Sequence, residues 1–129
     1  MVPVLIMSAE RAEYDAHTNS LRTDALVHDL ARLNLSAKPV VGAYQGTREE
    51  SFVVAVPDET SLVRATALAT LFDQEGVLYI DQDRRATLLY LATGERVDLG
   101  RFRAITRAEA EHADAYTFDP LTDTYYRAV

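Results

Sequence analysis

A chain of 129 residues, 48% of them hydrophobic, has the length of one domain and can form a core, which excludes an intrinsically disordered protein. The absence of cysteine excludes disulfide bonds and thiol chemistry. With 20 Asp and Glu against 13 Lys and Arg, the net charge of −7 argues against binding to a nucleic-acid backbone. The acidity suits a cationic ligand, a basic protein surface, or solubility alone.

The first 81 residues predict the order strand, helix, hairpin, helix, strand. Continuous apolar runs predict buried strands, a stripe at helical spacing predicts each helix, and two β-rich runs around a glycine predict the hairpin. These elements are a strand at residues 2–9, a helix at 20–33 capped by Ser20, a hairpin of 40–45 and 50–56 around a turn at 46–49, a helix beginning at 57–59, and a strand at 76–81.

The remaining residues predict further hairpins and one short helix. Strands are expected at 86–91 and 96–99, and a terminal hairpin at 116–118 and 124–127. Thr106 and Glu109 have the spacing of a capping box, which predicts a short helix. With no internal repeat or linker, residues 1–129 are interpreted as a single domain.

This order predicts an α+β fold with a ferredoxin-like βαββαβ core, an antiparallel sheet with both helices on one face. The C-terminal hairpins and the short helix would be additions to that core. No apolar run approaches the roughly 20 residues that a membrane span needs, and residues 1–9 lack the basic flank of a signal peptide. A cytoplasmic location is therefore expected, with no membrane partner.

The hairpin around residues 44–50 is the most informative part of the chain for chemistry. Because side chains alternate along a strand, Glu50 shares a face with Phe52 and Glu49 lies on the other face. If Tyr44 and Glu50 flank the turn, a phenol and a carboxylate meet at the end of an apolar face. The alternative is a solvated turn whose acids only keep the protein soluble. The three histidines are too scattered to predict a metal site.

Several short motifs resemble the bacteriophage S-adenosylmethionine lyases, formerly called S-adenosylmethionine hydrolases, and related small phage and bacterial proteins. The similar segments are residues 5–9, 19–22, 42–44 and 49–54, with weaker similarity at 74–78 and 94–95. The connection between Tyr44 and Glu49 is shorter than expected in that family.

The resemblance implies a lyase that splits S-adenosylmethionine into 5′-methylthioadenosine and homoserine lactone without metal or cofactor. The reaction would deplete the methyl donor of host restriction systems, in the host cytoplasm if the protein is phage-encoded. It also implies a homotrimer with sites between subunits. Tyr44 and Glu50 match the family's functional tyrosine and glutamate, Glu49 matches the neighbouring acid, and Ser8 and Ala9 would form the other wall of the site.

The substrate is already activated by its sulfonium, so its own carboxylate can close the lactone and the enzyme need only hold it folded. On this view Glu50 binds the α-ammonium and Tyr44 orients the methionine arm. Two alternatives remain open at this point. The chain could be a non-catalytic binding or inhibitor protein of a phage on the same fold, or a hydrolase in which Glu50 is the general base for a water.

Overall fold

The computed structural model describes residues 2–129, which form eight strands and three helices. In chain order these are β1 (Val4–Ser8), α1 (Ala16–Arg32), β2 (Ala37–Tyr44), β3 (Thr47–Ala55), α2 (Glu59–Leu71), β4 (Gly76–Ile80), β5 (Arg85–Tyr90), β6 (Arg96–Ile105), α3 (Arg107–Glu111), β7 (Ala115–Asp119) and β8 (Thr124–Ala128).

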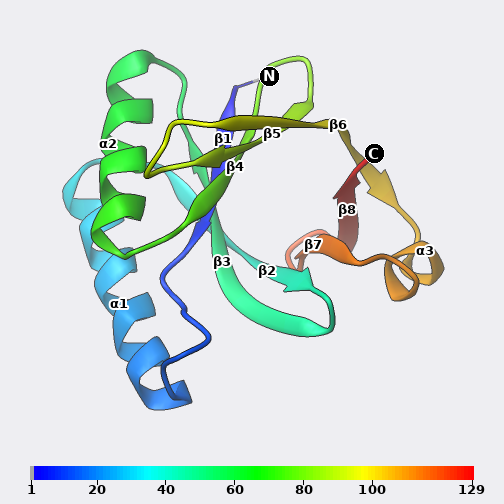
Figure 1. Ribbon diagram of the computed structural model, residues 1–129, viewed down its shortest axis with the longest axis horizontal. Helices are drawn as coiled ribbons and strands as arrows, with labels where there is room; N and C mark the ends of the chain where they lie inside the picture. Colours follow the sequence, from blue (N-terminus) through cyan, green and yellow to red (C-terminus); the bar gives the residue numbers. More distant parts are fainter. Residues whose placement is uncertain (1) are drawn as a thin grey trace.

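The eight strands form one closed antiparallel barrel (Figure 1). Around the barrel the order is β1-β3-β2-β7-β8-β6-β5-β4, so β1 lies between β3 and β4. Two long-range pairings close it, β2 with β7 and β6 with β8.

The prediction of an open ferredoxin-like sheet is wrong. The element order through β4 is as expected, but the C-terminal strands are not additions to a finished sheet. β5 pairs with β4, and β7 pairs with β2, so both edges of the four-stranded part are continued by further strands. Closing the barrel satisfies the edge hydrogen bonds that an open sheet would leave unpaired. Periodicity identifies strands but does not tell which edges meet.

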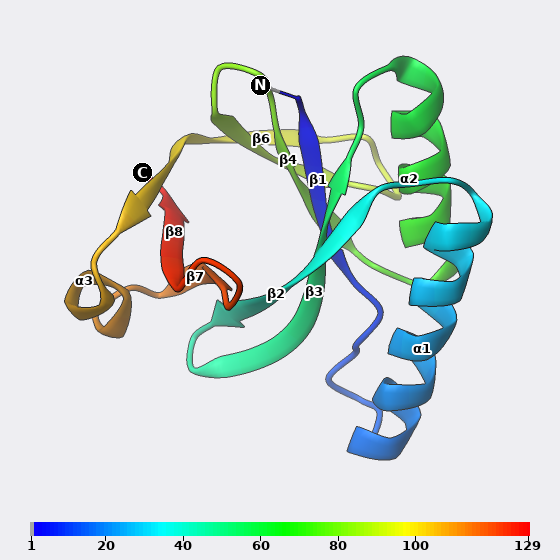
Figure 2. The same cartoon turned by 180° about the vertical axis from the view of Figure 1, so that it is seen from behind.

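Helices α1 and α2 lie together on the outside of the barrel, against one side of its wall (Figure 2). α1 begins four residues before the predicted Ser20 cap, because the Asp15 carboxylate accepts a hydrogen bond from the Thr18 amide at 2.7 Å and caps the helix there. In residues 2–129, no helix combines the length and hydrophobicity that a membrane span requires.

The apolar side chains form two separate cores, one on each face of the barrel wall. The outer core lies between the helices and the wall, where Leu5 and Val54 pack against Leu26 of α1 and are completely buried. The inner core lies inside the barrel around Ile80 and Phe102. The alternation of side chains along β1 and β3 therefore divides each strand between two different environments.

The β2–β3 hairpin is tighter than predicted. Its turn is Gln45-Gly46, both with positive φ (47° and 82°), and Tyr44 pairs directly with Thr47. Positive φ at both central positions is the geometry of a two-residue turn that matches strand twist. The predicted turn at 46–49 is therefore wrong, and Glu49 and Glu50 belong to β3. Gln45 carries no strong signal for this conformation, because Asn or Asp is the usual residue there.

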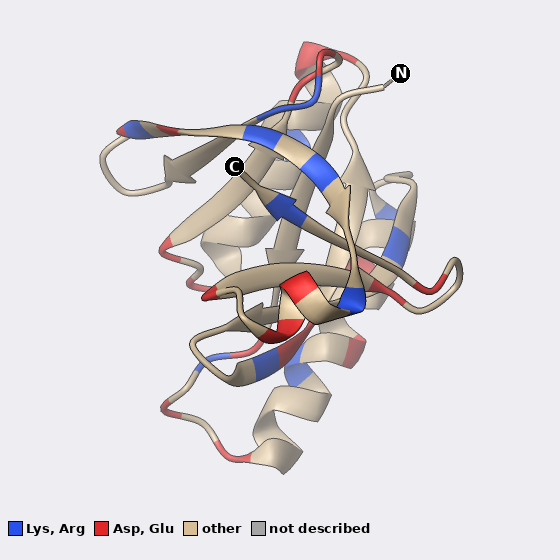
Figure 3. Cartoon of the chain, turned by 90° about the vertical axis from the view of Figure 1, so that its right-hand side faces the viewer, with Lys and Arg blue, Asp and Glu red and all other residues tan. Residues whose placement is uncertain are grey.

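Charge is distributed unevenly over the strands. β6 carries basic residues along its length, whereas β3 carries the two acids Glu49 and Glu50 directly after Arg48 in its first half (Figure 3). The acidic end of β3 is adjacent to the end of β1, where Ser8 pairs with Ser51. This end of the barrel wall brings together most of the predicted site residues.

Candidate functional site

The end of β1 and the beginning of β3 are joined by hydrogen bonds that extend past the last pair of the ladder. The Ser8 hydroxyl donates to the Glu50 carbonyl at 2.6 Å and accepts from the Glu10 amide at 3.1 Å. The Glu50 amide donates to Oε2 of Glu10. The backbone at Glu50 is thus fixed by the residues that follow β1.

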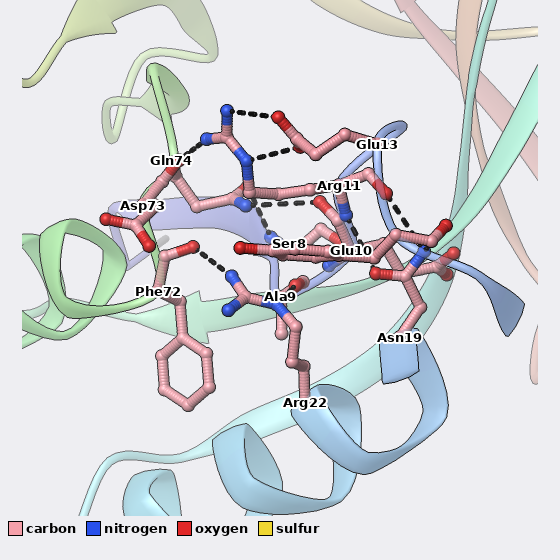
Figure 4. Close-up of polar contacts among 11 residues, drawn as sticks. Ser8, Ala9, Glu10, Arg11, Glu13, Asn19, Arg22, Phe72, Asp73 and Gln74 are labelled. Carbon is pink, nitrogen blue, oxygen red and sulfur yellow. Dashed lines mark hydrogen bonds and ion pairs between the residues drawn. The ribbon is translucent and has the colours of Figure 1, made fainter. Parts of the chain in front are cut away.

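The loop after β1 is held from helix α1 by a reciprocal side-chain clamp. The Asn19 amide nitrogen donates to the Arg11 carbonyl at 3.0 Å, and its oxygen accepts from the Arg11 amide at 3.0 Å (Figure 4). The Arg11 guanidinium forms an ion pair with Glu13 at 2.6 Å and donates to the Asp73 carbonyl. Asparagine suits this position because one amide group offers both a donor and an acceptor.

Arg22 links three elements from the middle of the same network (Figure 4). Its Nε donates to the Ala9 carbonyl at 2.7 Å, and its Nη2 donates to the Phe72 carbonyl beyond α2. The guanidinium also lies 5.0 Å from the ring centre of Tyr14 and 5.6 Å from that of Phe72. A planar cation with several donors can satisfy two carbonyls and stack at the same time, which lysine cannot.

Gln74 supports the end of β1 from the other side. Its carbonyl accepts from the Ser8 amide and its nitrogen donates to the Glu10 carbonyl, both at 3.4 Å. Ser8 and Ala9 are themselves buried, at 2% and 0% exposure. Ser8 and Ala9 are therefore held in place by this network, and the exposed side chains beside them are those of Glu49 and Glu50.

Glu10 and Glu49 form an acidic pair at this end of the barrel. Partial desolvation of the exposed Glu49 side chain, together with the charge of Glu10, raises the pKa of the Glu49 carboxyl group. Glu49 lies opposite Gly42 in the β2–β3 register, and a Cβ at Gly42 would stand 3.8 Å from the Glu49 side chain and 2.9 Å from the Ser51 hydroxyl. Glycine at this position leaves room for the acid.

The structure does not bring Tyr44 and Glu50 together. Tyr44 pairs with Thr47, three residues before Glu50, and Glu50 pairs with Val41. By strand alternation Tyr44 shares the barrel-facing side with Glu49, whereas Glu50 shares the outer side with Phe52. Tyr44 is also 63% exposed. The expected contact of a phenol with the Glu50 carboxylate is therefore wrong within one chain.

The structure brings the predicted residues Ser8, Ala9, Glu49 and Glu50 close together, and sequence reasoning did not identify most of the network that fixes them. The missed residues are Glu10, Arg11, Arg22 and Gln74. Arg22 reaches carbonyls 13 and 50 positions away, and such pairings leave no periodic signal in the chain. The only sequence signal for Arg22 was its position in the segment 19–22, which resembles the lyase family.

The site is anionic and rich in fixed backbone polar groups, which suits a cationic ligand. In residues 2–129, no three His, Asp or Glu side chains are grouped so that they could hold a metal ion. A family model described as the S-Adenosylmethionine lyase family matches residues 5–129, a range that includes every site residue described above. No curated protein matches the chain.

Proposed function

Because the chain belongs to the S-adenosylmethionine lyase family, we propose that it cleaves S-adenosylmethionine into 5′-methylthioadenosine and homoserine lactone. Family membership supports cleavage of S-adenosylmethionine in general. The products and the mechanism are inferred from the chemistry of the substrate and from the acidic site at the ends of β1 and β3.

In the proposed step an oxygen of the substrate's α-carboxylate attacks its own γ-carbon. The bond between that carbon and sulfur breaks, and its electron pair stays on sulfur, which becomes the neutral thioether of methylthioadenosine. The new carbon–oxygen bond closes the five-membered lactone, and the α-ammonium is unchanged. Neither water nor a proton is consumed, so positioning alone can supply about 7–11 kcal/mol of the acceleration.

The observation that carries the proposal is the acidic site made by Glu10, Glu49 and Glu50, in which hydrogen bonds hold the backbone of Glu10 and Glu50. A carboxylate in contact with the sulfonium would stabilise the substrate more than the transition state, in which that positive charge is being lost. We therefore assign Glu50 to the α-ammonium, whose charge is constant through the reaction. The Glu49 side chain projects from the opposite face of β3, so it would bind the substrate from the barrel-facing side.

The remaining assigned residues act through position. Ser8 and Ala9 are buried and hydrogen-bonded, so they would support the wall on which Glu10 and Glu50 stand. The network of Asn19 and Arg22 keeps the loop after β1 in one conformation, which an intramolecular reaction needs because its geometry must be held closely.

Tyr44 would orient the methionine arm, and this role requires a second copy of the chain. Tyr44 and Glu50 project from opposite faces of one hairpin, so a site that uses both is completed across an interface. An outward-facing aromatic cluster on the β7–β8 hairpin supports self-association, with Phe118 and Tyr125 rings 4.6 Å apart and Tyr116 and Tyr125 rings 5.5 Å apart. We propose a homotrimer with sites between subunits.

The biological role proposed for this reaction is depletion of the methyl donor in the cytoplasm of a bacterial host. Loss of S-adenosylmethionine would block methylation and restriction systems that depend on it, which would give a phage protection. No cofactor or nucleic-acid partner is invoked.

The test is to incubate the purified protein with S-adenosylmethionine and to follow the products by mass spectrometry. The proposal predicts methylthioadenosine in proportion to protein and time, with no slowing by a chelator. Arg96→Gln, a substitution at an exposed position on β6 outside the acidic site, should keep full activity. Protein that binds S-adenosylmethionine and leaves it intact would instead be a binding protein, and the proposed function would fail.

A further inference from the structure

The inside of the barrel is less completely filled than the layer between barrel and helices. On β1 and β3 the outward-facing Leu5 and Val54 are fully buried, whereas the inward-facing Val4, Ile6 and Val53 are only half-buried. Apolar side chains that face the middle of a closed barrel would be fully buried if neighbouring side chains filled it. Their exposure therefore indicates open space within the barrel.

That space is a cavity of about 350 Å³, within the size range of small-molecule sites. It lies at the end of the barrel where β1 and β2 begin, so it is at the opposite end from Glu10 and Glu49. An eight-stranded barrel is just wide enough to be filled by its side chains or to hold one small ligand. Most of the lining is apolar: Val4, Ile6, Val40, Val53, Ile80 and Phe102.

Polar residues that line the cavity include Thr117 and an ion pair, Lys38 with the buried Asp119. Lys38 Nζ lies 2.6 Å from Oδ2 of Asp119, and Oδ1 of Asp119 accepts from the Leu121 amide at 3.0 Å. The Asp119 side chain is 3% exposed, whereas that of Lys38 is 47% exposed. A lysine ammonium has three donors and no acceptor, so Lys38 can donate to a ligand as well as to Asp119.

A second cation, Arg84, also lines the cavity. Its backbone has a positive φ of 67° and is held by hydrogen bonds to Asp81 and Phe102, and its guanidinium lies 5.4 Å from the Phe102 ring centre. Phe102 in turn stacks on Tyr126 with ring centres 5.4 Å apart. In the same turn, the Asp81 carboxylate accepts backbone amides of Asp83 and Arg85, and neither Asp81 nor Asp83 lines the cavity.

We propose that the barrel cavity binds a small amphipathic carboxylate, with its apolar body among the valines and isoleucines and its carboxylate between Lys38 and Arg84. The lining carries two cations against one anion, Asp119, so a net positive charge remains for a ligand that accepts hydrogen bonds, and a carboxylate supplies the complementary charge. The site is separate from the acidic one at the other end of the barrel and does not depend on S-adenosylmethionine cleavage.

The test uses decanoate as the probe, below its micelle concentration, with decanol and decyltrimethylammonium as neutral and cationic analogues of the same chain. Calorimetry gives the affinities, and methyl NMR of valine and isoleucine locates the ligand. Decanoate should bind and shift the methyl signals of Val4, Ile6 and Val53, decanol should bind at least about tenfold more weakly, and the cation should not bind. Absence of decanoate binding, or equal affinity for decanol, overturns the proposal.

Two variants distinguish the contribution of the ligand's head group to binding from that of its apolar body. Arg84→Gln should weaken decanoate about tenfold and leave decanol unchanged, whereas Arg96→Gln, outside the cavity, should change neither. Val53→Phe should fill the space and weaken both ligands together, with methyl spectra showing that the variant is folded. Decanoate binding that survives Val53→Phe undiminished would place the ligand elsewhere and refute the site.

Discussion

The two faces of the wall formed by β1 and β3 differ in how they are used. The outer face is covered by α1 and α2, and its apolar side chains are completely buried, as Leu5 and Val54 show. The inner face surrounds a cavity, and Val4, Ile6 and Val53 stay half-buried. At the end of the same strands the division continues, with Glu50 on the outer side and Glu49 on the inner.

The outer face therefore contributes most of the packing that stabilises the fold, whereas the inner face leaves space for a ligand. The outer face is close-packed against helices and fixes the loop that supports Glu50, while the inner face keeps open space and the carboxyl group with the raised pKa. Changes on the outer side should therefore cost stability and activity, and changes on the inner side should be milder.

The largest expected effect is on the free energy of unfolding. Leu5→Ala on the outer face should lower it by about 3 kcal/mol, because a dry, close-packed site loses both transfer energy and contacts. Ile6→Ala, the next residue but facing the cavity, should cost clearly less, since its side chain is already half-exposed to that space. Urea unfolding of both variants measures the difference. An equal or larger loss for Ile6→Ala would mean that the inner face is packed as tightly as the outer.

Arg22 should have the next largest effect, because it ties the loop after β1 to both helices. Arg22→Ala removes charge-assisted hydrogen bonds to the Ala9 and Phe72 carbonyls, so we expect about 2 kcal/mol less stability and a roughly tenfold to hundredfold slower reaction. If Arg22 acts by positioning the wall, as proposed, the loss should appear mainly in kcat.

Two further variants test whether Arg22 is a positioning residue. Arg22→Lys should recover only part of the activity, since an ammonium keeps the charge but lacks the planar fork with which Arg22 donates to two carbonyls from different nitrogens. Arg32→Gln changes the same charge at the exposed end of α1, where Arg32 lies 3.5 Å from Asp29, and should leave turnover unchanged. If Arg22→Ala cleaves S-adenosylmethionine at the normal rate, the loop network has no part in the reaction.

Replacing Glu50 or Glu49 compares the contributions of the outer and inner faces to the reaction rate. Glu50→Gln keeps the size but loses the charge that would bind the α-ammonium, so activity should fall at least about tenfold. Glu49→Gln should be milder. An analogue of S-adenosylmethionine without the α-amino group should be a poor substrate, yet lose little more when Glu50 is replaced.

The outcome of this double cycle distinguishes two roles for Glu50. If Glu50 binds the ammonium, replacing Glu50 should have little further effect on the activity with an analogue that lacks the ammonium. If Glu50→Gln impairs both substrates equally, Glu50 acts as a general base and the hydrolase mechanism is favoured.

The smallest expected effect is the pH dependence contributed by Glu49. Its raised pKa means that the folded chain holds this proton more tightly than the unfolded chain does. The group therefore favours folding below the ordinary carboxyl range, and this contribution is lost as the pH rises through the raised pKa. At neutral pH, Glu49→Gln should be as stable as wild type or up to about 0.5 kcal/mol more stable.

Urea unfolding at neutral pH and at about pH 4 measures this difference, which should shrink or reverse at the lower pH. A variant that is less stable than wild type at neutral pH would show that the ionised Glu49 carboxylate is stabilised by its surroundings, contrary to its raised pKa.

Local elements of the fold could be predicted from the sequence, and their closure could not. The apolar run at residues 2–9 and the stripe ending at Leu33 identified β1 and α1, because burial on one side imposes a period on the chain. The pairing of β2 with β7 joins Val41 to Phe118, a contact set by three-dimensional topology. Nothing in either strand's own period predicts that partner, so the open-sheet interpretation failed there.

The candidate site was predictable to a similar extent. Strand alternation correctly put Glu49 and Glu50 on opposite faces, which needs only the identity of the strand. The position of Tyr44 depended on the turn, and the shift from a turn at 46–49 to Gln45-Gly46 moved its partner from Glu50 to Thr47. The supporting contacts of Arg22 and Gln74 depend on loops packing together, for which the sequence carries no spacing rule.

The most direct test of the central claim is the identity of the first product formed from S-adenosylmethionine. Early-time NMR of the purified wild-type protein with S-adenosylmethionine should show homoserine lactone rising together with methylthioadenosine, and homoserine only later as the lactone hydrolyses. Homoserine released from the start without prior lactone would contradict intramolecular attack by the substrate carboxylate and would require a water held in the site.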